Sequence, residues 1–390
     1  MRSEQLDYHL PPDRIATSAA EPRDAARLMF CDRGTGEVSH HRVSDLPELA
    51  RVTGGFPGPG DLMLVNQSKV VPARFFARRR QTGGKVEGLF LAEESPAGLA
   101  SGKGPDPAAS ASVLRWRCVF ETRGKPAGGE RMDLCDERGH DAGVALVLLE
   151  PVAGGEWRCA VEPAADAGGV STWSILDAVG STPLPPYIRK ARRAAGLAEQ
   201  QADDAGRYNT VYAQSPGSVA APTAGLHFTP DLLDRLDAAG VRRMAVTLHV
   251  GIGTFAPVRS ERLEDHAMHA EWIEVPSAVV RAITQTRDAG RRVWAVGTTT
   301  VRAIESLPSA CVAAGEGWTG ATELYITPDQ GFEFRHTDAL LTNFHLPRST
   351  LLAMVAALPG VGLDRLLSWY RQAIEAGYRF YSYGDAMLIV

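Results

Sequence analysis

The chain has 390 residues, of which 44% are hydrophobic and 22% are charged, and its formal net charge is −5. These values are ordinary for a soluble globular protein of roughly two to three domains. The sequence contains no run of about 18 apolar residues, so a membrane-spanning helix is not expected, and its polar N-terminal segment lacks the apolar core of a signal peptide. The five cysteines never form a Cys-x-x-Cys pair, which argues for a reducing compartment and against a structural zinc site. We therefore expect a cytoplasmic protein.

The region 75–165 contains four short strand candidates, separated by turns rich in glycine and proline, and shows no helical period. We expect it to form a small all-β, barrel-like domain, inserted into a discontinuous α/β domain made of residues 1–74 and 166–390. Within the insert, residues 95–110 have few bulky apolar side chains and are predicted to form a flexible surface loop. The strand candidates are KVEGLFLAEE (85–94), SVLRWRCVFET (112–122), GVALVLLEP (143–151) and EWRCAVEP (156–163).

Strand and helix signals alternate after residue 229. The first predicted helix has Thr229 as its N-cap, Pro230 in its first turn and Gly240 at its end. This alternation is typical of an α/β domain whose mixed sheet contains parallel strands. The predicted elements are helices at 229–240, at 276–290 and from about residue 298, and strands at 243–250 and 291–297.

Two stretches are strongly basic although the whole chain is acidic. Residues 69–85 carry six basic side chains, residues 187–193 carry four, and neither stretch contains an acidic residue. Each is either a solvated basic face or a patch that contacts the phosphates of a nucleic acid. The candidate tRNA-binding residues are Arg74, Arg78, Arg79, Arg80, Arg189, Lys190, Arg192 and Arg193.

Histidines are concentrated in segments rich in turn residues after position 220. A lone histidine is more often structural, but several of these follow predicted strands, and ligands in open α/β sheets bind at the carboxyl ends of strands. We therefore expect acid–base or hydrogen-bonding roles for this group. The candidate catalytic residues are His227, His249, His266, His269, Glu271 and His345.

The segment HAMHAE (266–271) has the composition of a metal site but not the spacing. On a helix Glu271 would lie about 140° around the axis from His266, and on a strand His266 would point away from His269 and Glu271. Zinc-binding helices of the HExxH type instead place their histidines four residues apart. We therefore predict no metal.

Three further segments indicate a ligand site. A Gly-x-Gly turn after the strand 243–250 would let the backbone approach a ligand, although a simple bend also explains it. A helix that begins with threonines suits a carboxylate, with Arg302 as its partner, although simple N-capping is the alternative. Aromatic residues in YRFYSYGDAM (378–387) form either edge-strand packing or a stacking surface for a base or a sulfonium. The candidate binding residues are Gly251, Gly253, Thr254, Phe255, Thr298, Thr299, Arg302, Asn343, Tyr383 and Asp385.

These segments together resemble the S-adenosylmethionine:tRNA ribosyltransferase-isomerase family of queuosine biosynthesis. They occur in family order from residue 7 to residue 387, and the insert matches least. The chain departs from the family pattern at 66–69 (Asn-Gln-Ser-Lys), at Asn209 and in YITPDQGFEF (325–334). The matching segments are DYHLPPDRIA, GDLMLVNQSKVVPAR, STPLPPYIRK, YNTVYA, GSVAAPTAGLHFT, VTLHVGIGTFAPV, DHAMHAE, AVGTTTVRAIES, LLTNFHLPRSTLL and YRFYSYGDAM.

The resemblance implies that the ribosyl part of S-adenosylmethionine moves onto 7-aminomethyl-7-deazaguanine at the wobble position of tRNA and is isomerised there. The products would be epoxyqueuosine in the tRNA, adenine and methionine. This chemistry needs a base that removes a proton beside the sulfonium, for which histidine is suited, and needs no metal or redox cofactor. The implied partners are S-adenosylmethionine, as co-substrate, and the anticodon loop of tRNA, whose bases stack on aromatic side chains and whose phosphates pair with arginine. We expect a monomer that does not contact a membrane.

Two alternatives remain open at this point: a metal-dependent hydrolase that uses His266, His269 and Glu271, and a non-catalytic tRNA-binding member of the family.

If the segment HAMHAE (266–271) is extended, His269 and Glu271 share one face. Glu271 would then orient a proton-transferring imidazole, and His266 would point away.

Overall fold

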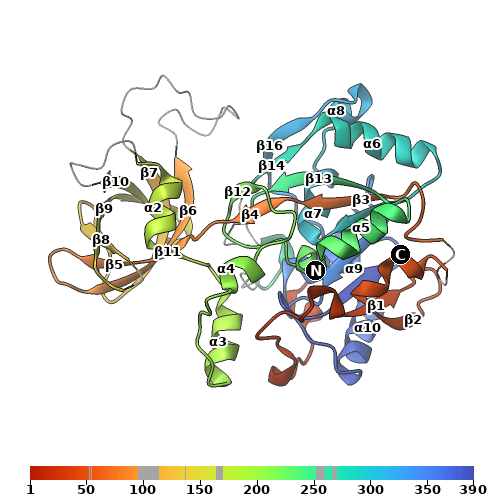
Figure 1. Ribbon diagram of the computed structural model, residues 1–390, viewed down its shortest axis with the longest axis horizontal. Helices are drawn as coiled ribbons and strands as arrows, with labels where there is room; N and C mark the ends of the chain where they lie inside the picture. The colour runs from red at the N-terminus through yellow and green to blue at the C-terminus, as the bar shows by residue number, and fades with distance from the viewer. Residues whose placement is uncertain are drawn as a thin grey trace. The chain divides into compact units, whose positions relative to one another are not determined.

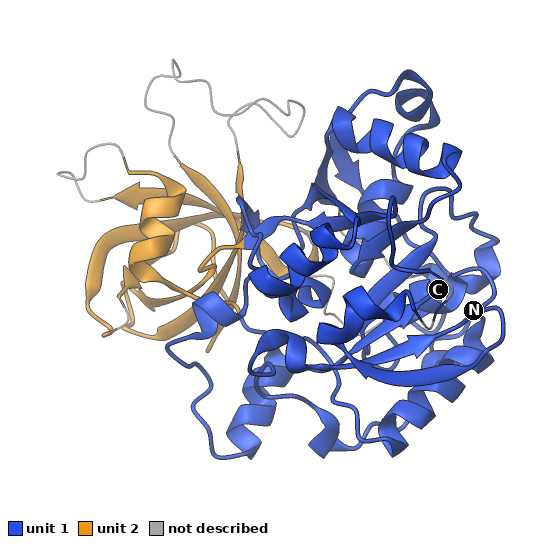
Figure 2. Ribbon diagram, turned by 45° about the vertical axis from the view of Figure 1, so that its right-hand side comes forward, with its two compact units in different colours: residues 1–69, 184–390 blue, residues 70–183 orange. Residues whose placement is uncertain are grey.

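A computed structural model gives the structure of the protein. It describes residues 1–51, 53, 55–94, 114–136, 138–163, 170–251, 260–265 and 270–390. The chain forms two compact units, which are unit 1 (residues 1–69 and 184–390) and unit 2 (residues 70–183) (Figure 2). The expected fold class, a mixed-sheet α/β domain interrupted by a small all-β insert, is confirmed. Residues 70–74 and 170–183, which we had assigned to the α/β domain, group with the insert instead.

Unit 1 is built on a mixed sheet. Its described strands, from one edge to the other, are β16 (Trp318–Thr322), β14 (Glu271–Val275), β13 (Arg242–Leu248), β3 (Leu62–Asn66), β15 (Val293–Val296), β17 (Ala339–Asn343), β18 (Ala386–Ile389), β1 (Arg27–Cys31) and β2 (Val38–Arg42). The neighbours β13, β3, β15 and β17 are parallel, whereas β14 and β18 run antiparallel to their inner neighbours. A separate two-stranded ladder joins β4 (Ser68–Val70) to β12 (Ser215–Ser218).

The described α-helices of unit 1 are α1 (Leu46–Leu49), α3 (Pro186–Ala194), α4 (Asp204–Arg207), α5 (Pro230–Ala238), α6 (Ser277–Asp288), α7 (Thr298–Glu305), α8 (Ser309–Ala314), α9 (Thr350–Ala357) and α10 (Leu363–Glu375). Its described 3-10 helices are η1 (Ser3–Leu6), η2 (Pro12–Arg14), η3 (Arg23–Ala25), η4 (Val43–Asp45), η6 (Thr223–His227), η8 (Leu263–Asp265) and η9 (Pro328–Gln330). The predicted helices and strands after residue 229 are confirmed to within a few residues. Thr229 caps α5 as expected, because its Oγ1 accepts a hydrogen bond of 3.1 Å from the backbone N–H of Leu232.

The central strands are apolar on both faces because helices cover both sides of the sheet (Figure 1). Every residue of β3 is buried. Since successive side chains alternate between faces, Met63 and Val65 pack in the core that includes α1 and α5. Leu62 and Leu64 pack in the opposite core, with α6 and α7.

Unit 2 is a closed antiparallel barrel, with its described strands in the order β11 (Gly180–Ser181), β5 (Arg74–Arg79), β6 (Lys85–Glu94), β7 (Arg115–Thr122), β10 (Glu156–Pro163), β9 (Asp141–Pro151) and β8 (Arg131–Cys135). The ring of β5, β6, β7, β10, β9 and β8 closes because β8 also pairs with β5, and the short strand β11 is added to β5 alone. A 3-10 helix, η5 (Ala153–Gly155), precedes β10.

The helix α2 (Thr172–Val179) explains why residues beyond 165 belong to the barrel unit. Trp116 is fully buried in the barrel, and its Nε1 donates a hydrogen bond of 2.8 Å to Oγ1 of Thr172. The predicted loop at 95–110 lies outside the described residues. Across the described part of the chain, no helix is long and apolar enough to cross a membrane.

Candidate active site

A depression in unit 1 lies where the parallel strands β15 and β17 end. Its walls include Gly297–Thr299, directly after β15, and Thr342–Leu346, at the end of β17. Its empty space is about 650 Å³ when the open mouth is included. The location agrees with the general rule that open α/β sheets bind ligands at the carboxyl ends of their strands.

The structure brings together four of the candidate residues at this depression: Thr298, Thr299, Asn343 and His345. Tyr381, an aromatic residue of the segment 378–387 that we had considered as a stacking surface, also lines it. Sequence reasoning missed other lining residues, among them Tyr187, Thr342 and Ser382. Tyr187 could have been found, because it lies in a segment that carries the family resemblance, but we had assigned that segment only to the basic patch.

The first turn of α7 forms one wall of the depression. Gly297 precedes the helix with φ +89°, a conformation that glycine adopts without strain. No side-chain cap is present at this described helix end, so simple N-capping by threonine is not what the structure shows. The Thr299 hydroxyl accepts a hydrogen bond of 3.3 Å from Nδ2 of Asn66, which ties this wall to the end of β3.

Asn343 and His227 form a buried pair beside the depression. His227 ends η6 and is 4% exposed, and Asn343 ends β17 and is 3% exposed. Nδ2 of Asn343 lies 3.1 Å from Nε2 of His227 and 3.5 Å from the carbonyl oxygen of Asp385. Burial lowers the pKa of His227 to about 3, and the positive charges of Arg379 and Arg23 act in the same direction. The imidazole is therefore neutral at physiological pH.

His345 is a second buried, neutral histidine. Its Nε2 lies 2.8 Å from Oγ1 of Thr342, and its backbone N–H donates to the Tyr370 hydroxyl at 2.9 Å. Burial lowers the pKa of His345 to about 3. Both side-chain and backbone contacts hold this residue in one orientation.

His249 directly follows β13, and it contacts residues that do not line the depression. Its Nδ1 is 2.9 Å from Oγ of Ser68, and its ring stacks on Trp272 with centroids 5.1 Å apart. A Cβ at Gly217 would lie 2.9 Å from Nε2 of His249, so only glycine allows this close approach. Burial lowers the pKa of His249 to about 4.

Glu271, the first residue of β14, forms a buried ion pair with Arg302 of α7. Its Oε1 also accepts a hydrogen bond of 2.8 Å from the backbone N–H of Gly251. Arg302 is 1% exposed, and its Nε donates to the carbonyl of Leu324 at 3.0 Å. The pairing engages the guanidinium that we had expected to hold a ligand carboxylate.

Two aromatic rings form another wall. The rings of Tyr187 and Tyr381 have centroids 4.8 Å apart, and the Tyr187 hydroxyl contacts the hydroxyl of Ser382. Tyr381 has φ +73°, an unusual value for a residue other than glycine, and such strained residues cluster at functional sites.

Tyr383 and Asp385 lie near this wall in sequence but are not among the lining residues. Tyr383 is buried against Tyr208, with ring centroids 5.9 Å apart. Asp385 accepts hydrogen bonds from the backbone N–H groups of Arg379 at 2.7 Å and Arg27 at 3.1 Å. In the structure, Asp385 holds the loop between α10 and β18.

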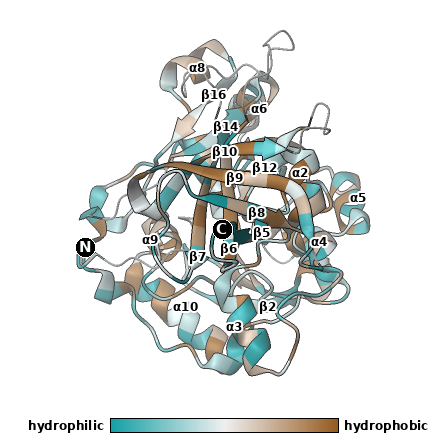
Figure 3. Cartoon of the chain, turned by 90° about the vertical axis from the view of Figure 1, so that its left-hand side faces the viewer, coloured by the Kyte–Doolittle hydropathy of each residue, from teal (hydrophilic) through white to brown (hydrophobic). Residues whose placement is uncertain are grey.

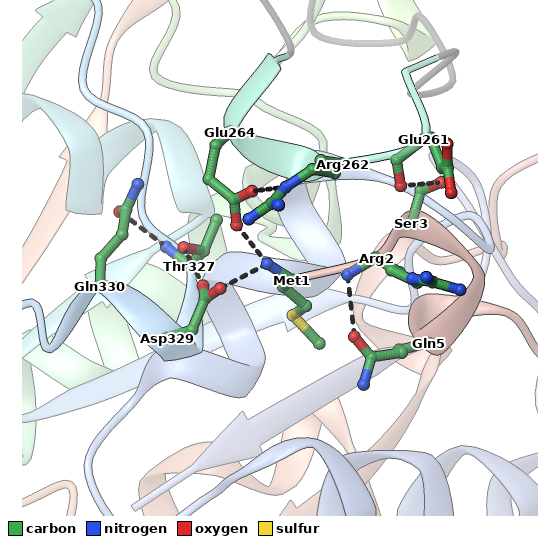
Figure 4. Close-up of polar contacts among 10 residues, drawn as sticks. All are labelled: Met1, Arg2, Ser3, Gln5, Glu261, Arg262, Glu264, Thr327, Asp329 and Gln330. Atoms are coloured by element: carbon green, nitrogen blue, oxygen red, sulfur yellow. Dashed lines mark hydrogen bonds and ion pairs between the residues drawn. The ribbon is translucent and has the colours of Figure 1, made fainter.

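Five candidates fall outside the described residues: Gly253, Thr254, Phe255, His266 and His269. The 3-10 helix η8 ends just before His266, and its position is fixed by an ion-pair cluster (Figure 4). There the α-ammonium of Met1 pairs with the carboxylates of Glu264 and Asp329. The hydrogen bond from this ammonium lowers the pKa of Asp329 to about 2. Within the described ranges, no cluster of three or more potential metal ligands is present.

The basic stretches are largely engaged in ion pairs. In unit 2, Nη1 of Arg79 is 3.2 Å from Glu130, Nε of Arg80 is 3.0 Å from Asp133, and Arg74 pairs with Glu87. Arg78 and Arg80 are exposed.

In unit 1, the basic residues lie on the hydrophilic helix α3 (Figure 3). Arg189 and Arg193 share Glu199, and Lys190 is exposed. Arg192 differs from them, because it is 1% exposed and makes two hydrogen bonds of 2.7 Å to Asp204. We therefore leave Arg192 out of the surfaces proposed for tRNA.

The fold and this site define an α/β protein with a barrel insert and a ligand depression at the carboxyl ends of parallel strands. The sequence model of a family described as "Queuosine biosynthesis protein" matches residues 3–389. The chain belongs to this family, which confirms the resemblance seen in the sequence.

Curated relatives and a solved structure agree with this assignment. The S-adenosylmethionine:tRNA ribosyltransferase-isomerase of Sorangium cellulosum is 46% identical, over 100% of this chain and 98% of its own length. The protein of the same name from Thermus thermophilus is 45% identical, over 99% of each chain. The crystal structure of S-adenosylmethionine tRNA ribosyltransferase from Thermotoga maritima superposes with a TM-score of 0.50 at 31% identity, and covers 99% of this chain and 100% of that one.

Proposed function

We propose that this protein transfers the ribosyl group of S-adenosylmethionine to 7-aminomethyl-7-deazaguanine in the anticodon of tRNA and isomerises it to epoxyqueuosine. Adenine and methionine are the other products. The observation that carries the proposal is the extent of the family match. It spans residues 3–389, and relatives that bear the name of this activity match at 45–46% identity over nearly their full length. The match therefore includes every element around the depression.

We further propose that S-adenosylmethionine binds in the depression at the ends of β15 and β17. The paired rings of Tyr187 and Tyr381 offer aromatic faces, which attract a cation such as the sulfonium. The low pKa values of His227 and His345 support this placement. Because both imidazoles are neutral, they do not repel the positive charge of the ligand.

The proton beside the sulfonium must be removed by a base, and efficient general bases have pKa values near the working pH. His227, His249 and His345 have pKa values of about 3 to 4 and are therefore weak bases. We propose that these three histidines hold neighbouring groups in place and that His269 is the base. The family resemblance of DHAMHAE and its position directly before β14 support this choice.

The activity is tested with purified protein, S-adenosylmethionine and tRNA that carries 7-aminomethyl-7-deazaguanine. Adenine and methionine should appear in equal amounts, and treatment of the protein with a chelator should not abolish the reaction. Formation of methylated tRNA and S-adenosylhomocysteine would instead identify a methyltransferase. Binding of tRNA without any release of adenine would support the non-catalytic alternative.

The choice of base is tested with His269→Ala and, as its matched control, His266→Ala. A positioned proton-transferring side chain contributes about 10²- to 10⁴-fold to the rate. His269→Ala should slow single-turnover adenine release by that factor, and His266→Ala should be the more active of the two at equal thermal stability. An inactive His266→Ala beside a nearly normal His269→Ala would show that the assignment is reversed.

A further inference from the structure

The side-chain amide of Asn343 has only one orientation that satisfies its surroundings. One end of the amide lies 3.1 Å from Nε2 of His227 and 3.5 Å from the backbone carbonyl of Asp385. A carbonyl oxygen can only accept a hydrogen bond, so this end of the amide must be the nitrogen. Nε2 of His227 must then accept the other N–H of the amide, which places the imidazole proton on Nδ1. Burial lowers the pKa of His227 to about 3, so this acceptor persists at physiological pH.

The oxygen of the amide is therefore at the end of the group that does not contact His227 or Asp385. Asn343 lines the depression, whereas His227 and Asp385, the partners of its nitrogen, do not. Oδ1 of Asn343 is buried and has no hydrogen-bond partner within the described structure. An acceptor that is removed from water without a donor destabilises the protein, so a ligand that supplies a donor here gains affinity.

The surroundings of this oxygen determine what kind of donor fits. Among the described lining residues there is no aspartate or glutamate, and several are apolar, including Pro222, Ala224, Val250 and Phe344. An ammonium group would lose its hydration here without a compensating charge, which is unfavourable. A neutral donor avoids this cost. A hydroxyl can donate to this oxygen, but it can also turn and accept a hydrogen bond from another group. A neutral amino group on an aromatic ring acts only as a donor, so it matches an acceptor more selectively.

We propose that Asn343 is a specificity-determining residue whose Oδ1 accepts a hydrogen bond from the 6-amino group of the adenine of S-adenosylmethionine. This inference rests on the proposed function and deepens it. His227 is the positioning residue, since it holds Nδ2 and thereby keeps the oxygen toward the ligand. The contact selects adenine over purines that lack an amino group at this position.

The test compares S-adenosylmethionine with its analogue in which hydrogen replaces the 6-amino group, by direct measurement of binding to the full-length protein. The wild type should bind the analogue roughly ten- to a hundredfold more weakly, because an unpaired buried acceptor remains. Asn343→Ala should bind both compounds with similar affinity. Thr342→Val, the matched control at the neighbouring lining position, should keep the preference, because the Thr342 hydroxyl is engaged by His345.

These binding measurements test the role of Asn343 independently of the catalytic activity. Equal binding of the two compounds by the wild type overturns the inference without any variant, and so does full discrimination by Asn343→Ala. If Asn343→Ala does not fold, the comparison of the two compounds on the wild type still decides, because it needs no variant. A wild type that discriminates between the compounds but releases no adenine would count against the proposed function alone.

Discussion

Three histidines of unit 1 are largely buried in the folded chain, and burial lowers their pKa values, so their imidazoles stay uncharged. The sequence could place His227, His249 and His345 in segments that resemble the family, but it could not give their protonation. Their pKa values depend on burial, which arises from strands and loops far apart in sequence. We had expected acid–base or hydrogen-bonding roles for the histidines, and the low pKa values of these three favour hydrogen bonding.

The first prediction concerns stability at acidic pH. A pKa of about 3 for His345, against about 6.5 when unfolded, means that the unfolded chain takes up the proton first. The stabilisation is complete above about pH 6.5 and is lost as the pH falls toward 3. His345→Gln removes this titration, so the loss of unfolding free energy between pH 6.5 and 4.5 should be smaller by roughly 2–3 kcal/mol.

Urea unfolding at several pH values measures this effect. The control is His9→Gln, which changes an exposed histidine. It should leave the pH profile of the wild type unchanged. If His345→Gln also follows the wild-type profile, His345 is not the group that is protonated on unfolding.

Glu271 and Arg302 show a second limit of reasoning from sequence. We had given them separate roles, one beside an imidazole and one toward a ligand carboxylate. The structure joins them in one buried ion pair between β14 and α7. The two residues are 31 positions apart in the sequence, and no pattern between them predicts this contact.

The second prediction follows from this pair. Glu271→Gln leaves Arg302 buried without its counter-charge, which typically costs about 3–5 kcal/mol of unfolding free energy. Glu274→Gln is the matched control on the same strand, because Glu274 is exposed while Glu271 is buried. It should change stability by less than about 0.5 kcal/mol. Equal unfolding midpoints for the two variants would contradict a structural role of the pair.

At the scale of elements, most of unit 1 after residue 229 could be predicted from local signals. Thr229 and Pro230 mark the start of α5, and glycines close α5 and α6, because caps and breakers act through neighbouring backbone groups. The assignment of α2 to the barrel could not be predicted in this way. It depends on the contact between Trp116 and Thr172, which are separated by 56 positions.

The third prediction concerns the start of α7. Gly297 has φ +89° and ψ 149°, a region essentially restricted to glycine, so Gly297→Ala should cost about 1–3 kcal/mol through backbone strain. Steric overlap contributes little, since the nearest atoms to a new Cβ are 3.6 Å away. The variant should also weaken binding of S-adenosylmethionine, because the first turn of α7 lines the depression.

Thermal unfolding and ligand titration measure both effects. Gly206→Ala is the control, because Gly206 lies in α4 and a Cβ there would have no neighbour within 4 Å. It should be neutral or slightly stabilising. A Gly297→Ala protein as stable as the control would show that this backbone conformation is not strained.

At the scale of the whole molecule, the acidic net charge conceals local basic surfaces. The sequence identified both stretches but could not tell which arginines face solvent, because exposure depends on the folded neighbours. Arg192 is buried with Asp204, whereas Arg78 and Arg80 remain exposed on the barrel.

The fourth prediction tests the barrel surface for tRNA. Replacing Arg78 and Arg80 together by Ala should lower the affinity for tRNA, whatever the sequence of the tRNA. The dependence of log K on log salt should become shallower by up to ~0.9 for each phosphate that is no longer neutralised. Affinity for S-adenosylmethionine should not change. The control is Arg371→Ala on α10, an exposed arginine outside both stretches. A salt dependence equal to that of the control would identify the barrel arginines as a solvated face.

The pairing of β11 with β5 also affects how such a chain can change over evolution. Gly180 pairs with Phe75 and Ser181 with Arg74, so the segment that enters unit 2 and the segment that leaves it are neighbours in one ladder. Opposed residues of an antiparallel pair are only about 5 Å apart. The host chain therefore needs to bridge only this short span, whatever is enclosed between the two segments. Insertions, deletions or complete replacement inside the barrel leave that span unchanged. The insert can thus diverge in length and sequence while the mixed sheet of unit 1 keeps its register.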